Sequence, residues 1–262
     1  MIPEHYSPTA MFCYHECHRK YYLKYVEKIQ VPLSVRLLEG DLFHERIAGA
    51  SRELVAKLFN ERKRHYAFPA KDSDASILGG IETALGLYQM WHNVEGGEFE
   101  HEVDITAPVS AVLGEDLPKS MASVMSLYDE IKSKQVIMFA DLLDVNKPLL
   151  VDLKLRTRQT TDVTCRDETQ LGLYSIGTEI NRGLTTDLSL LSISYAAGGS
   201  IRPLEIPPIK MIRNNARNTL ASYIIGVALD DFAKTPHPLC GNCEYSSECK
   251  RESKDMWEEM PR

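Results

Sequence analysis

Two carboxylates and one amine lie close together in the middle of the chain, within residues 136–154 (VIMFADLLDVNKPLLVDLK). Asp141 and Asp152 each follow an apolar run, and Lys154 comes two residues after the second acid. Because a β-strand points alternate side chains to the same face, Asp152 and Lys154 should project together while Leu153 points into the core. The sequence therefore predicts an acid and an amine side by side on one face of a sheet.

A turn over residues 145–148 would fold this stretch into a hairpin and bring Asp141 alongside Asp152. Two buried carboxylates and an amine cost free energy unless something charged is held between them. Hard oxygen ligands suit Mg²⁺ and Mn²⁺, and a nearby lysine can steady an attacking water or the charge of a phosphate. Since Asp-x-Lys is also common on solvated sheet edges, this catalytic interpretation depends on support from other parts of the chain.

The composition is that of a soluble globular protein, with 44% hydrophobic and 26% charged residues among 262. No N-terminal segment resembles a signal peptide, and no apolar run approaches the roughly 20 residues of a membrane span. We therefore expect a cytoplasmic protein that does not contact membranes. The net charge of −7 argues against a surface that binds nucleic acid everywhere, but it allows a local basic groove.

Three of the six cysteines, Cys240, Cys243 and Cys249, lie within ten residues of one another. In a reducing cytosol such a cluster indicates a metal site rather than disulfides. Tetrahedral zinc and a 4Fe-4S cluster both require a fourth ligand, which this segment lacks. Cys13 and Cys17 are four residues apart and should share one side of a predicted helix.

Helices are expected over residues 7–25, 40–59, 75–92, 166–181 and 209–232, and strands over residues 99–106, the two runs of the central hairpin and 188–197. Residues 108–133 should form an insertion with a short helix.

His44 lies in the first turns of the second helix, and a lone histidine is more often structural than a ligand. Gln170 and Tyr174 share one face of the fourth helix. Cys165 is outside every motif and should be a small buried side chain.

Four motifs in this order resemble the RecB-type branch of the PD-(D/E)XK nuclease superfamily: Gly40-x-x-x-His44, Asp141, Asp152-Leu-Lys154 and Gln170-x-x-x-Tyr174. Residues 16–23 (ECHRKYYL) resemble the Cys-Pro-Arg-Lys-Phe-Tyr segment of its iron–sulfur members, although His18 replaces the usual proline. Those members include the AddB nuclease domain and the small CRISPR-associated RecB-like exonucleases. The three C-terminal cysteines match the family's C-terminal trio, so the resemblance spans nearly the whole chain.

The resemblance implies an α/β fold with a restriction-endonuclease-like core, in which helices flank a central mixed sheet. Residues 1–262 would form a single RecB-like nuclease domain, with residues 36–233 as the nuclease core. Residues 1–35 and 234–262 would form an iron–sulfur lobe that joins the N- and C-terminal segments.

The resemblance also implies a role for each motif residue. The ligands of a catalytic Mg or Mn ion would be His44, Asp141, Asp152 and the carbonyl of Leu153. Lys154 would position or activate the water, and Gln170 and Tyr174 would orient that lysine or contact DNA. A 4Fe-4S cluster would be held by Cys17, Cys240, Cys243 and Cys249, with Cys13 as the rival N-terminal ligand, and would act as a structural clamp.

The implied activity is that of a metal-dependent DNA exonuclease on single strands or ends. The usual polarity in the family is 5′ to 3′, so the resemblance favours that direction. It also implies a role in recombination, repair, replication or CRISPR adaptation, with protein partners in a recombination or CRISPR complex. Two alternatives stay open at the level of sequence. One is a DNA-end-binding subunit that keeps an inactive nuclease core, and the other is a zinc-stabilised interaction protein.

Overall fold

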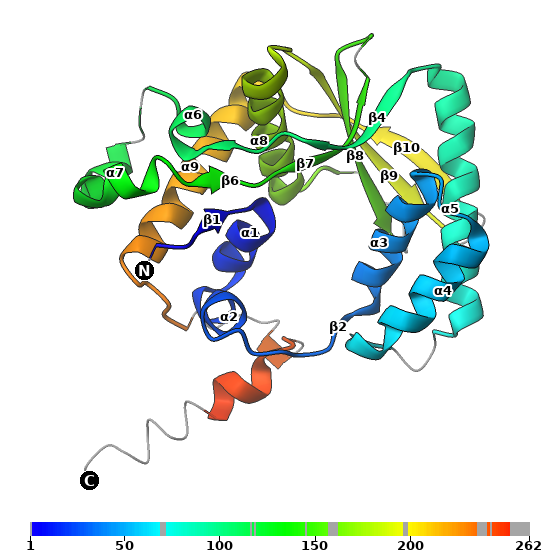
Figure 1. The fold of residues 1–262 in the computed structure, drawn as a ribbon, viewed down its shortest axis with the longest axis horizontal. Coiled ribbons are helices and arrows are strands. Elements are labelled where there is room, and N and C mark those ends of the chain that lie inside the picture. The colour runs from blue at the N-terminus through cyan, green and yellow to red at the C-terminus, as the bar shows by residue number, and fades with distance from the viewer. Residues whose placement is uncertain are drawn as a thin grey trace.

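The computed structural model describes residues 2–68, 72–115, 117, 119–144, 146–156, 162–195, 199–234, 240–241 and 243–251. Within them, a five-stranded sheet of order β10-β9-β8-β7-β4 lies at the centre (Figure 1). Its strands are β4 (Phe99–Asp104), β7 (Phe139–Asp144), β8 (Leu149–Arg156), β9 (Asp187–Ser194) and β10 (Ser200–Leu204). β8 and β9 are parallel and the other neighbours are antiparallel, so the central sheet is mixed, as expected.

The predicted central hairpin is present, because β7 and β8 pair antiparallel over residues 142–144 and 149–151. Asp144 stabilises the turn between them: its Oδ1 atom accepts a hydrogen bond from the N–H of Asn146 (2.9 Å). Val145, the first residue of the predicted turn, lies outside the described residues. The hairpin brings the two acidic segments of the sequence into one strand pair.

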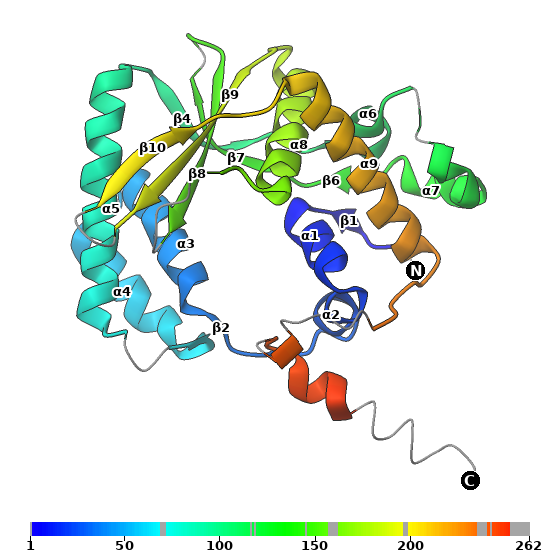
Figure 2. The same cartoon turned by 180° about the vertical axis from the view of Figure 1, so that it is seen from behind.

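Helices cover both faces of this sheet (Figures 1 and 2). One face packs against α3 (Val35–Ile47), α4 (Arg52–Arg62) and α5 (Asp74–Glu95). The opposite face packs against α1 (Pro8–Glu16), α8 (Cys165–Arg182) and α9 (Ile209–Ala228). Strands that are buried on both faces have continuous apolar runs, which explains the sequence of β7, β8 and β9. Acidic side chains in these strands are exceptions that need another explanation.

The prediction of one continuous helix over residues 7–25 is wrong, because the helix is interrupted at Cys17. The backbone of Cys17 is extended (φ −164°, ψ 118°), and α2 (His18–Tyr21) and a π-helical turn (Tyr22–Val26) follow it. Cys13 and Cys17 therefore do not share one side of a helix. Cys13 packs into the core, whereas Cys17 lines a pocket. Neither glycine nor proline marks the interruption in the sequence.

The helix predicted over residues 40–59 is two helices. α3 begins before Gly40, after the side chain of Ser34 accepts a hydrogen bond at its N-terminus. Gly49 has a φ of 101°, a left-handed conformation that favours glycine, and it separates α3 from α4. Ser51 then caps α4 by accepting a hydrogen bond from the N–H of Leu54 (3.2 Å). The glycine and the capping serine were both visible in the sequence as signals of this boundary.

The other predicted elements are confirmed with shifted ends, as α5, α8, α9, β4 and β9. Residues 196 and 197 of the last predicted strand lie outside the described residues, and β10 is an additional strand. The insertion contains β5 (Ala107–Pro108), α6 (Val109–Leu113), a 3-10 helix (Lys119–Leu127) and α7 (Tyr128–Ile131). β6 (Gln135–Val136) pairs with β5 and with β1 (His5–Tyr6) in a second small sheet. A third sheet pairs β2 (Leu33–Ser34) with β3 (Tyr66–Ala67), and a 3-10 turn (Lys63–His65) precedes β3.

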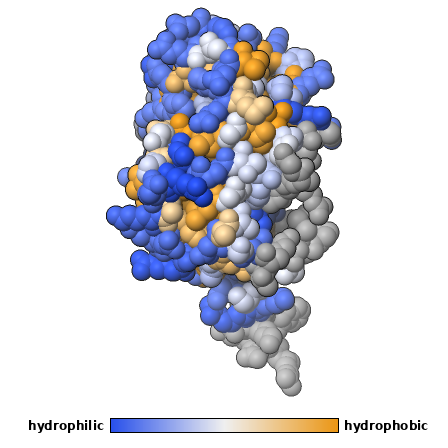
Figure 3. Space-filling model, turned by 90° about the vertical axis from the view of Figure 1, so that its right-hand side faces the viewer, coloured by the Kyte–Doolittle hydropathy of each residue, from blue (hydrophilic) through white to orange (hydrophobic). Residues whose placement is uncertain are grey.

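The surface over α4 and α5 is mostly hydrophilic, with apolar side chains between the polar ones (Figure 3). The large apolar side chains exposed on these two helices include Leu54, Met90 and Val94. Apolar atoms make up much of any protein surface, so their exposure needs no special explanation. No helix in the described part of the chain has the length and apolar character to cross a membrane.

Candidate active site

The two acidic residues of the hairpin lie where the pairing of β7 and β8 ends. The strands are paired as far as Leu142 and Val151. Beyond this pair, the N–H of Leu153 donates a hydrogen bond to Oδ2 of Asp141 (2.6 Å) in place of a backbone carbonyl. The neighbouring Asp152 has a side chain that is 1% exposed. The structure therefore brings Asp141 and Asp152 together at one point of the sheet, as the sequence predicted.

Lys154 connects these acids to helix α8. Its Nζ donates hydrogen bonds to Oδ1 of Asp152 (3.1 Å) and to Oε1 of Gln170 (3.0 Å). The same Nζ is 2.9 Å from Oδ2 of Asp152, but the geometry gives no second hydrogen bond, so this buried oxygen has no hydrogen-bond partner. Gln170 in turn donates from Nε2 to the hydroxyl of Tyr174 (2.6 Å). Lysine, glutamine and tyrosine therefore form one chain of contacts.

Burial controls the ionisation of the site. It raises the pKa of Asp141 and of Asp152 above the usual range of an aspartate, and the positive charge of Lys154 only partly opposes the rise. Burial also raises the pKa of Tyr174, so its hydroxyl keeps the proton. The pKa of His44 is lowered by burial, which leaves the imidazole neutral at pH 7. Buried acids and a neutral imidazole are groups that gain from a bound cation.

His44 approaches the acids from α3. Its Nδ1 is 3.9 Å from Oδ1 of Asp141, and its side chain is 22% exposed. Both residues line a hollow of about 360 Å³ whose remaining lining residues are Asp41, Glu45, Arg62, Glu102 and Phe139. The catalytic and metal-binding residues predicted from the sequence therefore converge from α3, β7, β8 and α8.

Sequence reasoning missed five residues of this hollow, of which Asp41, Glu102 and Phe139 differ in the signal that the sequence offered. Asp41 precedes His44 by three positions in α3, a spacing that shares a helix face and could have identified it. Glu102 lies in β4 between His101 and Val103, which pair with Leu142 and Ala140 of β7, and has a left-handed backbone (φ 46°). Nothing in the strand sequence distinguishes Glu102 from its acidic neighbours. Phe139 belongs to the apolar run before Asp141, yet half of its surface is exposed.

Helix α8 holds its polar side chains at a depth fixed by close packing. The side chain of Thr164 caps its N-terminus. Gly172 lies so close to α9 that an added Cβ would be 2.5 Å from the carbonyl oxygen of Ile212. A larger residue there would push the two helices apart. The glycine therefore helps to place Gln170 against Lys154.

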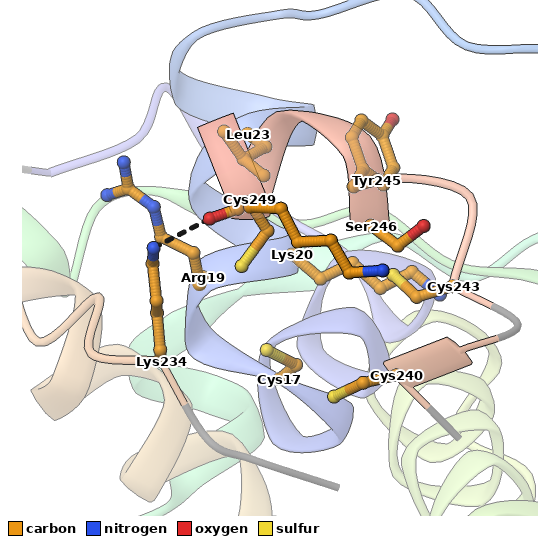
Figure 4. A pocket seen from close by; sticks show the side chains of 11 residues that line it. Cys17, Arg19, Lys20, Leu23, Lys234, Cys240, Cys243, Tyr245, Ser246 and Cys249 are labelled. Atoms are coloured by element: carbon orange, nitrogen blue, oxygen red, sulfur yellow. Dashed lines mark hydrogen bonds between the residues drawn. The ribbon is translucent and has the colours of Figure 1, made fainter. Parts of the chain in front are cut away.

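The four cysteines of the predicted cluster line one pocket of about 220 Å³ (Figure 4). Cys17 comes from the interruption between α1 and α2, and the other three come from the C-terminal segment beside α2 (Figures 1 and 2). Arg19, Lys20, Lys234 and Lys250 border the same pocket, and the ammonium group of Lys20 pairs with Glu16 and Glu244 (3.1 Å each).

Cys13 and Cys165 are not among the residues that line this pocket. Cys13 is 6% exposed, and burial raises the pKa of its thiol to about 11. A metal ligand must be the thiolate, so the position of Cys13 disfavours it. The prediction that Cys165 is buried is wrong: it is exposed, because it is the first residue of α8 and follows the cap at the surface.

Within the described ranges, no group of three His, Cys, Asp or Glu side chains is arranged to hold a metal ion. At the acids, one oxygen of Asp141 accepts a hydrogen bond from the N–H of Leu153, and one oxygen of Asp152 accepts one from Nζ of Lys154. At the cysteines, the thiols are not gathered around one point, as a single tetrahedral zinc with Zn–S distances of about 2.3 Å would require. The buried Oδ2 of Asp152 without a hydrogen-bond partner and the cysteine-lined pocket nevertheless suit, in their chemistry, a hard cation and a thiolate-bound cluster.

Comparison with solved structures shows a shared fold. A protein from Eubacterium rectale that is provisionally named an exonuclease superposes with a TM-score of 0.60 and 11% identity, over 94% of this chain and 88% of that chain. The structure of SSO0001 gives a TM-score of 0.38 and 14% identity, over 81% of this chain and 94% of that chain. The second similarity is too low to support an argument.

Comparison with sequences gives the family. No curated protein matches the chain significantly. The sequence profile described as the PD-(D/E)XK nuclease superfamily matches residues 5–250, a range that contains both the acidic hairpin and the C-terminal cysteines. The chain belongs to the PD-(D/E)XK nuclease superfamily.

Proposed function

We propose that the protein is a divalent-metal-dependent DNA exonuclease that acts on single strands or strand ends with 5′ to 3′ polarity. The observation that carries this proposal is the convergence of Asp141, Asp152 and Lys154 where β7 and β8 separate. Membership of the superfamily supports the nuclease class. The similarity to a solved structure named as an exonuclease favours attack from an end.

Each active-site residue has a role that its contacts support. Asp141, Asp152, the carbonyl of Leu153 and His44 would hold Mg²⁺ or Mn²⁺. When bound, such an ion lowers the pKa of a water and stabilises negative charge on the phosphate. Gln170 accepts a hydrogen bond from Lys154 and keeps its ammonium beside the acids. In that position the ammonium can orient a water and stabilise charge that develops on the phosphate.

The first test measures cleavage of labelled single-stranded DNA in Mg²⁺ or Mn²⁺. Asp152→Ala and Lys154→Ala should each reduce the rate about 100-fold or more, because each removes charge stabilisation from the transition state. Met90→Ala, on the far helix α5, should cut like the wild type. Undiminished cleavage in both active-site variants would refute the assigned centre.

The form of the DNA identifies the mode of action. Strands labelled at the 5′ or the 3′ end should release label in the order that 5′ to 3′ attack predicts, and a circular single strand should stay intact. Rapid cutting of the circle would show an endonuclease instead. Wild-type protein that retains DNA ends without cutting them in either metal would favour the inactive end-binding subunit.

We also propose that Cys17, Cys240, Cys243 and Cys249 hold a 4Fe-4S cluster that acts as a structural clamp. The pocket that the four cysteines share supports this assignment. Anaerobic reconstitution should give a brown protein with visible iron–sulfur absorbance, which Cys17→Ser should lose. Cys165→Ser, at the exposed cysteine outside the pocket, should keep it. A colourless preparation with one tightly held zinc would favour the zinc-stabilised interaction protein.

A further inference from the structure

Phe139 is the most exposed residue of the apolar run that leads into Asp141. Burial alternates along this run: Val136, Met138 and Ala140 are at most 1% exposed, Ile137 is partly buried, and Phe139 is 50% exposed. An aromatic ring left in water forgoes the stabilisation that burial gives. Single exposed apolar side chains are ordinary, so the exposure of Phe139 has meaning only through its position.

Phe139 lies in the wall of the candidate active site. Phe139 and Asp141 are alternate residues of β7, so their side chains lie on the same side of the strand, about 6.8 Å apart along it. Both line the hollow that also contains His44. The ring therefore lies two residues along the strand from Asp141, the carboxylate assigned to the metal under the proposed function.

The charges of the hollow indicate which part of a nucleotide fits beside the ring. Asp41, Glu45 and Glu102 line it, and Arg62 is 3.2 Å from Glu45 in an ion pair. These acidic residues repel any phosphate that is not neutralised by a bound cation, but they do not repel a neutral base. The flat face of an aromatic ring stacks on any base, because every base has a π-face.

We propose that Phe139 is the stacking platform for the base next to the scissile phosphate, and that it selects unpaired nucleotides. This inference rests on the proposed nuclease function and deepens it by naming the residue that would select unpaired nucleotides. Inside a duplex, neighbouring bases cover both faces of each base. Only a single-stranded, frayed or flipped base can stack on Phe139.

Substitutions of Phe139 separate stacking from simple apolar contact. Phe139→Ala should lower kcat/KM for single-stranded DNA about 5- to 100-fold, the range that loss of one base–aromatic stack gives. Phe139→Leu should be impaired in the same way, because it keeps apolar bulk without a flat ring. Phe139→Trp should retain activity, and Met90→Ala, exposed on α5, should have no effect. Wild-type rates in Phe139→Ala would overturn the proposal.

The decisive control removes the base instead of the ring. On an oligonucleotide made of abasic units, the wild type and Phe139→Ala should cleave at equal rates, because there is no base to stack. A defect of the same size on abasic and on normal DNA would show that Phe139 only supports the fold of the site. That result would also overturn the proposal.

A binding measurement keeps this inference separate from the proposed function. With 2-aminopurine at the end of a single strand and Ca²⁺ as the metal, stacking should quench the fluorescence of the base. Quenching should occur with the wild type and Phe139→Trp but not with Phe139→Ala. Quenching by a wild type that cuts no DNA in Mg²⁺ or Mn²⁺ would refute the nuclease proposal and keep the platform. Equal quenching by the wild type and Phe139→Ala, or no quenching by the wild type, would refute the stacking role of Phe139.

Discussion

At the scale of single residues, the acids of the candidate site destabilise the metal-free fold at neutral pH. Burial raises the pKa of Asp141 to about 6 and the pKa of Asp152 to about 7. The unfolded chain, in which an aspartate titrates near pH ~3.9, releases these protons first. Both groups therefore stabilise the fold fully at pH below about 4, and this contribution is lost as the pH rises through 6 to 7.

A neutral side chain of the same shape should remove this pH dependence. In metal-free protein, Asp152→Asn should melt higher than the wild type at pH 8, because the buried amide carries no charge, and should have no such advantage at pH 4. Each kcal/mol gained corresponds to about 2–4 °C for a domain of this size. Thermal unfolding followed by circular dichroism measures the difference.

The matching control is Asp187→Asn, at the exposed start of β9. It should show no difference from the wild type that depends on pH between 4 and 8. An Asp152→Asn protein that is less stable than the wild type at pH 8 would contradict the electrostatic argument.

At the scale of secondary structure, apolar periodicity predicted the long helices and the hairpin but not their interruptions. The boundary between α3 and α4 had signals in Gly49 and Ser51, and attention to them would have found it. The interruption at Cys17 had none, because no glycine or proline stands there and no capping side chain marks the start of α2. The extent to which Phe139 is exposed was not predictable either, since it depends on which elements cover that face of β7.

The packing of α8 on α9 gives a prediction about helix position. Gly172→Ala should destabilise the protein by about 1–3 kcal/mol, because the new methyl group would meet the backbone of α9. It should also lower nuclease activity, since α8 carries Gln170. The free energy of unfolding in urea and the cleavage rate measure both effects.

A second helical glycine supplies the control. Gly86 of α5 has nothing within 4 Å of an added Cβ, so Gly86→Ala should stabilise the protein by up to about 1 kcal/mol through helix propensity. Equal stability of the two variants would contradict the close approach of α8 and α9.

At the scale of the whole molecule, the segment from Cys17 through α2 meets the C-terminal segment at the cysteine pocket (Figures 1 and 4). The family resemblance predicted an α/β protein with a mixed sheet, and it also predicted an iron–sulfur lobe made of the N- and C-terminal segments. Residues 235–239 and 252–262 of the predicted iron–sulfur lobe lie outside the described residues. The approach of Glu102 and Phe139 to His44 needed the tertiary structure, because these residues come from β4, β7 and α3.

A cluster between Cys17 and residues 240–249 would close almost the whole chain into a loop. By analogy with cross-links over long loops, its loss should lower the free energy of unfolding by about 4–5 kcal/mol. Chelation of the reconstituted protein, or Cys17→Ser, should therefore lower the midpoint of urea unfolding, while Cys165→Ser should leave it nearly unchanged. A midpoint that does not move after loss of the metal would show that the cluster is not a clamp.

The hydrogen bond from the N–H of Leu153 to Asp141 has a consequence for hydrogen–deuterium exchange. In a regular strand, an amide proton is shielded by the backbone of its neighbour, so mutation of one side chain hardly changes its exchange. Here the amide of Leu153 is protected by a titratable carboxylate, that of Asp141. The exchange rate of this amide therefore reports whether Asp141 is protonated, ionised or bound to a metal. Spectroscopists could then follow occupancy of the acidic pair from a single resonance, without DNA and without turnover.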